Sequence, residues 1–214
     1  MPRISPSLLD NYSICPAFTY REYENTGNDA AAEGTLIHSA LETDDDSDLT
    51  SEQQRVLEKT REVIQAQLIG YLDWENCPVH QRIELHEQKL TGSFGLRGKM
   101  DRAYCNLYNR KALCLDLQTG RNGLIRSAAD SLQMAAYGDL LFTLYATHID
   151  EVKVGLVSPR TNEVDFHVYS FTDWEDLRDR IKTVMDSVDD PFKSPAPSDT
   201  LCPKCAHFAR CPAV

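Results

Sequence analysis

The sequence predicts an α/β fold in which a mixed central β-sheet is flanked by helices. Segments with helical periodicity alternate along the chain with strand-like segments, which favours a layered arrangement of both. The 214 residues are enough for a single domain with a sizeable core. Apolar residues make up 42% and charged residues 26% of the chain, as is usual for a globular protein. We therefore expect one domain over residues 1–214.

Three helices are expected before the first strand, over residues 5–24, 30–41 and 51–71. Ser5 or Ser7 can cap the first helix, and Pro16 can bend it. Residues 42–48 include three successive aspartates, which most simply form a solvated acidic loop between the second and third helices.

Strand-like patterns then dominate the chain. Alternating or compact apolar residues indicate five strands, over residues 82–90, 96–105, 111–117, 151–157 and 163–171. The most regular apolar stripe consists of Leu132, Ala136, Leu140 and Leu144. It predicts a helix over residues 128–146. Thr172 is expected to cap a last helix that ends near Val188, and a proline-rich irregular tail follows.

The charge of the chain limits its partners. It carries 22 basic and 33 acidic residues, a formal net charge of −11. A surface that binds polyanions in general is therefore disfavoured, and a nucleic-acid partner requires a local basic track or metal ions.

No segment approaches the roughly 20 apolar residues of a membrane span, and the first residues lack the apolar region of a secretory signal. We expect a soluble, cytoplasmic protein.

Carboxylates on two neighbouring strands form a candidate metal site. Asp116 and Gln118 lie two apart, so they point to one face, with the Leu117 carbonyl beside them. Asp101 lies on the preceding strand, and a turn at residues 106–110 would bring the two aspartates together. Two carboxylates in one cleft repel each other unless they share a proton or bind a cation, and oxygen ligands suit Mg²⁺ or Mn²⁺. From spacing alone, the simpler explanation is that both aspartates are ordinary strand-end residues.

Three further polar residues fall on expected helices. Gln133 and Tyr137 lie four apart and share one helix face, and His38 lies on the second helix. Taken singly, each is as well explained by packing or by exposure at the surface.

The seven cysteines are unevenly distributed. An odd number argues against a complete disulfide framework. Three of them crowd the C-terminal tail, and Cys15 stands alone near the start, which suggests a metal site. Cys77, Cys105 and Cys114 are scattered and are most simply loop or core residues.

Together, these motifs resemble the RecB-like nucleases of the PD-(D/E)XK superfamily. The shared motifs are, in order, Tyr12-x2-Cys15-Pro16, Gly34-x3-His38, Gly98-x2-Asp101, Asp116-x-Gln118-Thr119-Gly120, Gln133-x3-Tyr137 and Cys202-x2-Cys205-x5-Cys211. The first and last are typical of the iron–sulfur branch, which includes the CRISPR-associated exonuclease and the AddB nuclease domain. Each motif is common singly, but six in this order over residues 5–212 are specific. The resemblance implies a restriction-endonuclease-like core.

The resemblance also implies a function, namely a metal-dependent DNA exonuclease that hydrolyses phosphodiester bonds in single strands or at DNA ends. By this resemblance, Mg²⁺ or Mn²⁺ would be held by His38, Asp101, Asp116 and the Leu117 carbonyl. Gln133 and Tyr137 would steady the active site and the DNA strand. DNA is the implied partner, with a helicase or recombination protein as a further candidate. Recombination, repair and CRISPR adaptation are the implied settings, and phages often encode such nucleases.

Two sets of charged residues remain ambiguous. Glu84 and Glu87 are equal candidates to assist the metal ligands. Four basic residues near the motifs are either a positive track for DNA or ordinary surface residues: Arg97, Lys99, Arg121 and Arg126.

Position 118 departs from the family pattern, which usually has Lys there. That Lys orients the attacking water and stabilises charge on the phosphate. Gln118 keeps a hydrogen-bonding amide but loses the positive charge. Three explanations stay open: an enzyme that works with Gln, a slow or catalytically inactive DNA- or partner-binding relative, or an engineered inactivating change.

By the same resemblance, a [4Fe–4S] cluster would be bound by Cys15, Cys202, Cys205 and Cys211. The cluster would tie residues 1–24 to residues 189–214, and closing so long a loop fits a stabilising role. The spacing alone also allows a local zinc site formed by the three tail cysteines and His207. That alternative leaves Cys15 as a small buried apolar residue.

Overall fold

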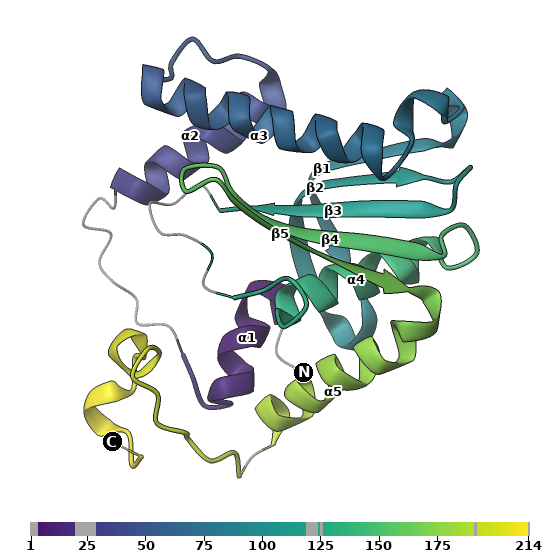
Figure 1. Ribbon diagram of the computed structural model, residues 1–214. Helices are drawn as coiled ribbons and strands as arrows, with labels where there is room; N and C mark the ends of the chain where they lie inside the picture. Colours follow the sequence, from purple (N-terminus) through teal and green to yellow (C-terminus); the bar gives the residue numbers. More distant parts are fainter. Residues whose placement is uncertain (1–3, 20–28, 119–123, 125, 191, 214) are drawn as a thin grey trace.

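The computed structural model describes residues 4–19, 29–118, 124, 126–190 and 192–213. A five-stranded mixed sheet has helices on both faces, which is the architecture that the sequence predicts (Figure 1). The helices are α1 (Pro6–Ile14), α2 (Asp29–Thr43), α3 (Ser51–Gly70), α4 (Leu132–Tyr145) and α5 (Trp174–Asp189). The strands are β1 (Arg82–Thr91), β2 (Arg97–Asn106), β3 (Lys111–Leu117), β4 (Glu151–Ser158) and β5 (Glu163–Ser170). In the described ranges, no helix combines the length and the apolar character needed to cross a membrane.

The strands are ordered along the sheet as they are along the chain. β3 and β4 pair in parallel, whereas the other neighbours pair antiparallel. A parallel pair needs a crossover, and α4 provides it. α4 covers one face of the sheet over a core that includes Cys105 and Cys114, and α3 covers the other face over Leu113 and Leu115. β3, which ends at Asp116 and Leu117, is therefore buried on both faces.

α1 ends at Ile14, so the prediction of a helix up to residue 24 is wrong for its described part. Cys15 has an extended backbone, with φ −141° and ψ 101°, and no helix is present in the described residues that follow it, up to residue 19. The cause is Pro16, because a residue that precedes proline avoids the helical region. Residues 20–24 lie outside the described part of the chain. Cys15 thus begins an irregular segment directly after the helix.

α4 begins at Leu132, four residues later than predicted, because its cap is Ser131. The Ser131 hydroxyl accepts the Met134 N–H at 3.3 Å. The buried Asp10 carboxylate, which comes from α1, accepts the Leu132 N–H at 2.8 Å and the Ser131 hydroxyl at 3.0 Å. Two caps, one of them from a distant segment, fix where α4 starts.

α5 is not capped by Thr172, contrary to the prediction. Thr172 lies inside a 3₁₀ turn, Phe171–Asp173, that precedes the helix. Ser170 and Asp173 form the capping box of that turn. The five strands, by contrast, begin and end within one residue of their predicted bounds.

β1 and β2 form a two-stranded ribbon. The set of alternate residues that faces the core changes halfway along this ribbon. Met100 and Ala103 both pack under α4, although simple alternation would place residues three apart on opposite faces. The regular pairing of β1 with β2 skips Glu87 and Asp101, and Glu87 has a left-handed backbone with φ 51°. Such a backbone is rare for a residue with a side chain. The irregularity leaves Glu87 and Asp101 side by side and half-buried.

Candidate metal centre

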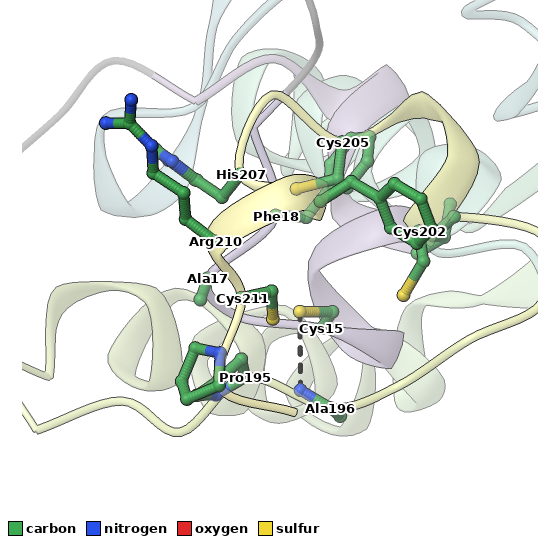
Figure 2. Close-up of a pocket in the computed structure, with 13 residues that line it drawn as sticks. Cys15, Ala17, Phe18, Pro195, Ala196, Cys202, Cys205, His207, Arg210 and Cys211 are labelled. Carbon is green, nitrogen blue, oxygen red and sulfur yellow. Dashed lines mark hydrogen bonds between the residues drawn. The ribbon is translucent and has the colours of Figure 1, made fainter. Parts of the chain in front are cut away.

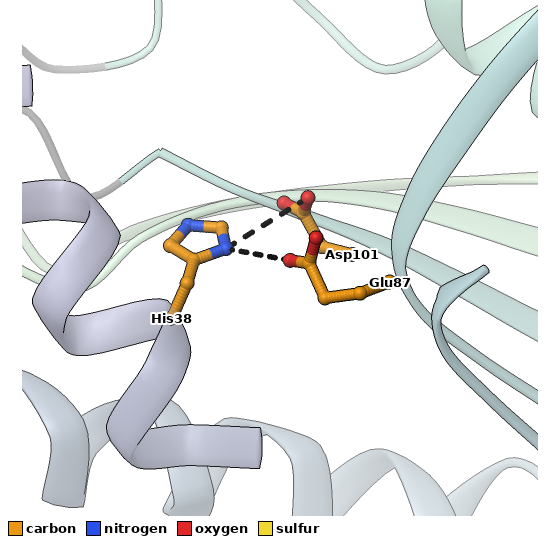
Figure 3. A group of neighbouring side chains, drawn as sticks. All are labelled: His38, Glu87 and Asp101. Carbon is orange, nitrogen blue, oxygen red and sulfur yellow. Dashed lines mark hydrogen bonds and ion pairs between the residues drawn. The ribbon is translucent and has the colours of Figure 1, made fainter. Parts of the chain in front are cut away.

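Three side chains from three elements converge at the end of the sheet: His38 of α2, Glu87 of β1 and Asp101 of β2 (Figure 3). One ligand atom from each lies within 4.8 Å of the others. His38 Nδ1 is 3.2 Å from Glu87 Oε1 and 3.8 Å from Asp101 Oδ1. Within the described ranges, this is the one group of three or more His, Cys, Asp or Glu side chains that come so close. An imidazole with two carboxylates is a donor set for a divalent cation.

Both ring nitrogens of His38 face hydrogen-bond acceptors. Nδ1 faces the Glu87 carboxylate, and Nε2 lies 3.2 Å from the Leu117 carbonyl oxygen. The Lys99 ammonium also contacts Glu87 Oε2. Glu87 is therefore contacted by both His38 and Lys99.

Asp116 of β3 lies next to Asp101. Its removal from water and, to a lesser extent, the neighbouring Asp101 carboxylate together raise the pKa of Asp116 to about 7. Burial also raises the pKa of Asp101, and His38 partly offsets this increase. Two desolvated carboxylates side by side are stable only with a shared proton or a bound cation. The electrostatics of the two strands therefore fit a divalent ion.

The side chain of Asp101 joins β2 to β3 where their backbone pairing stops. The last backbone pair of these strands is Arg102 with Leu115. Beyond it, Asp101 Oδ2 accepts the Leu117 N–H at 2.8 Å. This bond keeps the Leu117 carbonyl and both aspartates at one strand end.

Neutral amides hold Asp116 from two sides. Gln133 Nε2 donates to Asp116 Oδ1 at 2.8 Å, and the Gln118 side chain also hydrogen-bonds to Asp116. Gln133 Nε2 donates to the Tyr137 hydroxyl at 3.2 Å, which itself donates to the Lys99 carbonyl at 2.9 Å. The α4 residues that the sequence analysis named thus connect the two aspartate-bearing strands.

Asp10 fixes the start of α4, which carries Gln133, and was not identified from the sequence. Besides capping α4, its carboxylate lies 3.4 Å from the Gln133 N–H and 2.5 Å from Arg126. The only sequence signal was a carboxylate on the inner face of the first helix, which does not reveal a partner more than a hundred residues away.

The structure distinguishes the two glutamates and places most of the basic residues. Glu87 belongs to the metal-binding group, whereas Glu84 lies 3.5 Å from His86 Nε2. Lys99 contacts Glu87, and Arg126 pairs with the capping residue instead of lying free at the surface. Arg121 lies outside the described residues.

Apart from the metal centre, a cavity of about 290 Å³ is lined by Cys15, Cys202, Cys205 and Cys211 (Figure 2). All four are free thiols, and the sulfurs of Cys15 and Cys211 face each other in the cavity. The Ala196 N–H donates to Cys15 Sγ at 3.5 Å, and the Ser198 N–H donates to Cys202 Sγ at 3.2 Å. The tail is also joined to the N-terminal segment because the Ala206 N–H donates to the Thr19 carbonyl at 2.8 Å.

The sulfurs are spaced more widely than one zinc ion requires. Tetrahedral zinc with Zn–S bonds of about 2.3 Å holds its ligand atoms roughly 4 Å apart. In the described part of the chain, no three of the tail's Cys and His ligand atoms, with or without Cys15, lie within 4.8 Å of one another.

Comparison with known proteins agrees with this geometry. The family model of the PD-(D/E)XK nuclease superfamily matches residues 3–212. The chain is similar at 12% identity to the crystal structure of SSO0001, with a TM-score of 0.36 and coverage of 100% of this chain and 87% of that chain. It is similar at 12% identity to a phage-related exonuclease from Haemophilus somnus 129PT, with a TM-score of 0.39 and coverage of 86% and 91%.

Both TM-scores are low, so these two structures carry no weight in the assignment. No curated protein matches the chain. The family model, however, spans nearly every residue, including the strands and helices that bring His38, Asp101 and Asp116 together. This protein belongs to the PD-(D/E)XK nuclease superfamily.

Proposed function

We propose that this protein is a metal-dependent deoxyribonuclease that hydrolyses phosphodiester bonds in single-stranded DNA or at DNA ends. The observation that carries the proposal is the convergence of His38, Glu87 and Asp101 beside Asp116. His38, Asp101, Asp116 and the Leu117 carbonyl hold Mg²⁺ or Mn²⁺, and Glu87 joins them. The raised pKa of Asp116 beside Asp101 supports this donor set, because two buried carboxylates side by side favour a bound cation.

The chain's own residues position this site. A bound divalent ion would polarise the phosphate and lower the pKa of a coordinated water, which supplies the nucleophile. Gln133 and Gln118 orient the Asp116 carboxylate, and Tyr137 holds β2 through the Lys99 carbonyl. Gln118 provides hydrogen bonds without charge, so the ammonium beside the carboxylates comes from Lys99. That ammonium is available to offset negative charge that develops on the phosphate.

A cleavage assay tests the proposal. End-labelled single strands, blunt duplexes and closed circular DNA are incubated with Mg²⁺ or Mn²⁺ and with EDTA. We expect metal-dependent loss of the linear substrates, survival of the circles, and loss of activity in Asp116→Asn. Equal activity of wild type and Asp116→Asn would contradict the proposed site, and cleavage of the circles would show endonuclease action instead.

Gln118 favours a second candidate, a catalytically inactive relative that binds DNA or a protein partner such as a helicase or recombination factor. This candidate predicts DNA affinity without turnover under either metal. Cleavage by the wild-type protein, lost in Asp116→Asn, excludes it.

We also propose that Cys15, Cys202, Cys205 and Cys211 bind a [4Fe–4S] cluster that ties residues 1–24 to residues 189–214. The convergence of the four cysteines on one cavity and the two backbone N–H donors to sulfur support this proposal. We expect brown protein with about four irons and four labile sulfides per chain after anaerobic purification. A colourless protein with one zinc, unaffected by Cys15→Ala, would establish the zinc alternative.

A further inference from the structure

The outer half of the β1–β2 ribbon forms a groove with a charge opposite to that of the whole protein. Its volume is about 410 Å³, and it is lined by Ser5, Lys89, Thr91, Arg97, Gly98 and Lys99. Three of the six residues are cationic and none is acidic, although the chain as a whole has a net charge of −11. We propose that this basic groove binds the phosphodiester backbone of a nucleic-acid strand that enters the metal centre. The inference rests on the proposed nuclease function and names the residues that hold its substrate.

The two lysines of the groove face each other across the strands. Lys89 and Lys99 are direct partners in the antiparallel register. Like charges at such positions destabilise a sheet, whereas an acidic residue at either position would stabilise it. Within the described residues, no carboxylate oxygen lies within 4.0 Å of a charged nitrogen of Lys89 or Arg97. Glu87 balances the charge of Lys99, so the unbalanced charges of the groove are those of Lys89 and Arg97, which a bound polyanion would neutralise.

The groove lies directly beside the metal centre. The Lys99 ammonium contacts Glu87, which belongs to the metal-binding group. Asp101, Lys99 and Arg97 follow one another in steps of two residues, which is about 7 Å per step along a strand. A strand with one phosphate at the metal therefore passes its neighbouring phosphates along the cations.

The floor of the groove is held by packing on the opposite side of the ribbon. A Cβ atom at Gly98 would lie 2.6 Å from Pro6 Cγ and 3.4 Å from a ring carbon of Tyr137. Only glycine allows α1 and α4 to approach the strand so closely. The cations are thus carried by a backbone that two helices fix.

The chemistry of the groove sets its specificity. Ammonium and guanidinium groups recognise phosphates, and no aromatic side chain lines the groove to stack a base. We therefore expect binding that is independent of base sequence and that accepts both DNA and RNA backbones.

Binding measured without catalysis tests the inference. Fluorescein-labelled DNA and RNA single strands of the same sequence are titrated with full-length protein in EDTA over a range of salt concentrations. Lys89→Gln and Arg97→Gln should each weaken binding roughly fivefold at about 50 mM salt and reduce the salt slope by about 0.7. The matched control is Lys182→Gln, an exposed α5 lysine that pairs with Asp186 and should change neither quantity.

Thermal unfolding separates a binding role from a structural one. Because Lys89→Gln removes a like-charge pair, it should raise the melting temperature by about 1–3 °C while it weakens binding. Groove variants that bind as Lys182→Gln does, or a Lys89→Gln variant that loses both binding and stability, would overturn the inference. If the wild-type protein cleaves DNA but the groove variants bind as tightly as it does, only the role of the groove is refuted. If the wild-type protein does not cleave DNA but the groove variants show weaker salt-dependent binding, only the nuclease function is refuted.

Discussion

The metal centre and the cysteine cavity differ in how the chain builds them. Each donor of the metal centre lies on a helix or on a strand, and hydrogen bonds link His38 to Leu117, Asp101 to Leu117 and Asp116 to Gln133. The cysteine cavity is formed by irregular segments from the two ends of the chain, which are joined by few hydrogen bonds. The fold therefore fixes the donors of the metal centre by itself, whereas we expect the cysteine region to depend on the cluster proposed to fill it.

The largest effect that we expect is on activity, at the preformed centre. Asp116→Asn keeps the shape of the side chain but removes the charge that a metal needs. Cleavage should fall about a thousandfold, equivalent to roughly 4 kcal/mol of transition-state stabilisation. The melting temperature without metal at pH 8 should not fall, because the variant removes an unfavourable buried charge. A parallel loss of folded protein in circular dichroism would show that Asp116 is structural instead.

The cysteine region should show the reverse, a loss of stability. Cys15→Ala should abolish iron binding and lower the free energy of unfolding by about 3 kcal/mol, since the ends of a long loop are released. The residues after α5 should then become sensitive to limited proteolysis. Cys77→Ala, a buried cysteine remote from the two cysteine motifs in sequence, serves as the control and should retain its iron. Iron retention by Cys15→Ala would contradict the contrast drawn here.

A change of pH tests the metal centre reversibly, without affecting the cysteine region in the same way. The folded pKa of Asp116, about 7, lies above its ordinary value of 3.8, so the folded chain binds the proton more tightly than the unfolded chain does. Stability without metal should be fully present below about pH 4 and should fall as the pH rises toward 7. Because Mg²⁺ competes with that proton, the rise in melting temperature that it causes should be larger at pH 8 than at pH 6. Asp116→Asn should abolish the difference, as differential scanning fluorimetry can show.

The sequence predicted the elements of the site better than its connections. Strand bounds were correct within one residue because alternation is a local signal, and the motif residues could be named by resemblance. The choice of Glu87 over Glu84 was not predictable, since it depends on a left-handed backbone at Glu87 and on the register with β2. The role of Asp10 was also hidden, because its partners lie at the start of α4 and become neighbours only on folding.

The smallest effect should come from Gln118→Lys. An ammonium beside Asp116 favours its ionised form, so cleavage at pH 7 should rise about tenfold and its pH midpoint should fall. Gln118→Met, which has neither amide nor charge, is the control and should not show this gain. No increase in a protein shown to bind metal would exclude a catalytic role for position 118.

Lys99 sharpens this last test, because it already places a positive charge beside the carboxylates. If Lys99 supplies the charge that Gln118 lacks, Lys99→Met should reduce cleavage by itself, and Gln118→Lys should restore more activity in that background than it adds to wild type. Such coupling in a double-mutant cycle would show that the two positions act on one shared network of charges in the metal centre. Strictly additive effects would mean that Lys99 serves only to bind DNA, as Lys89 and Arg97 are proposed to do.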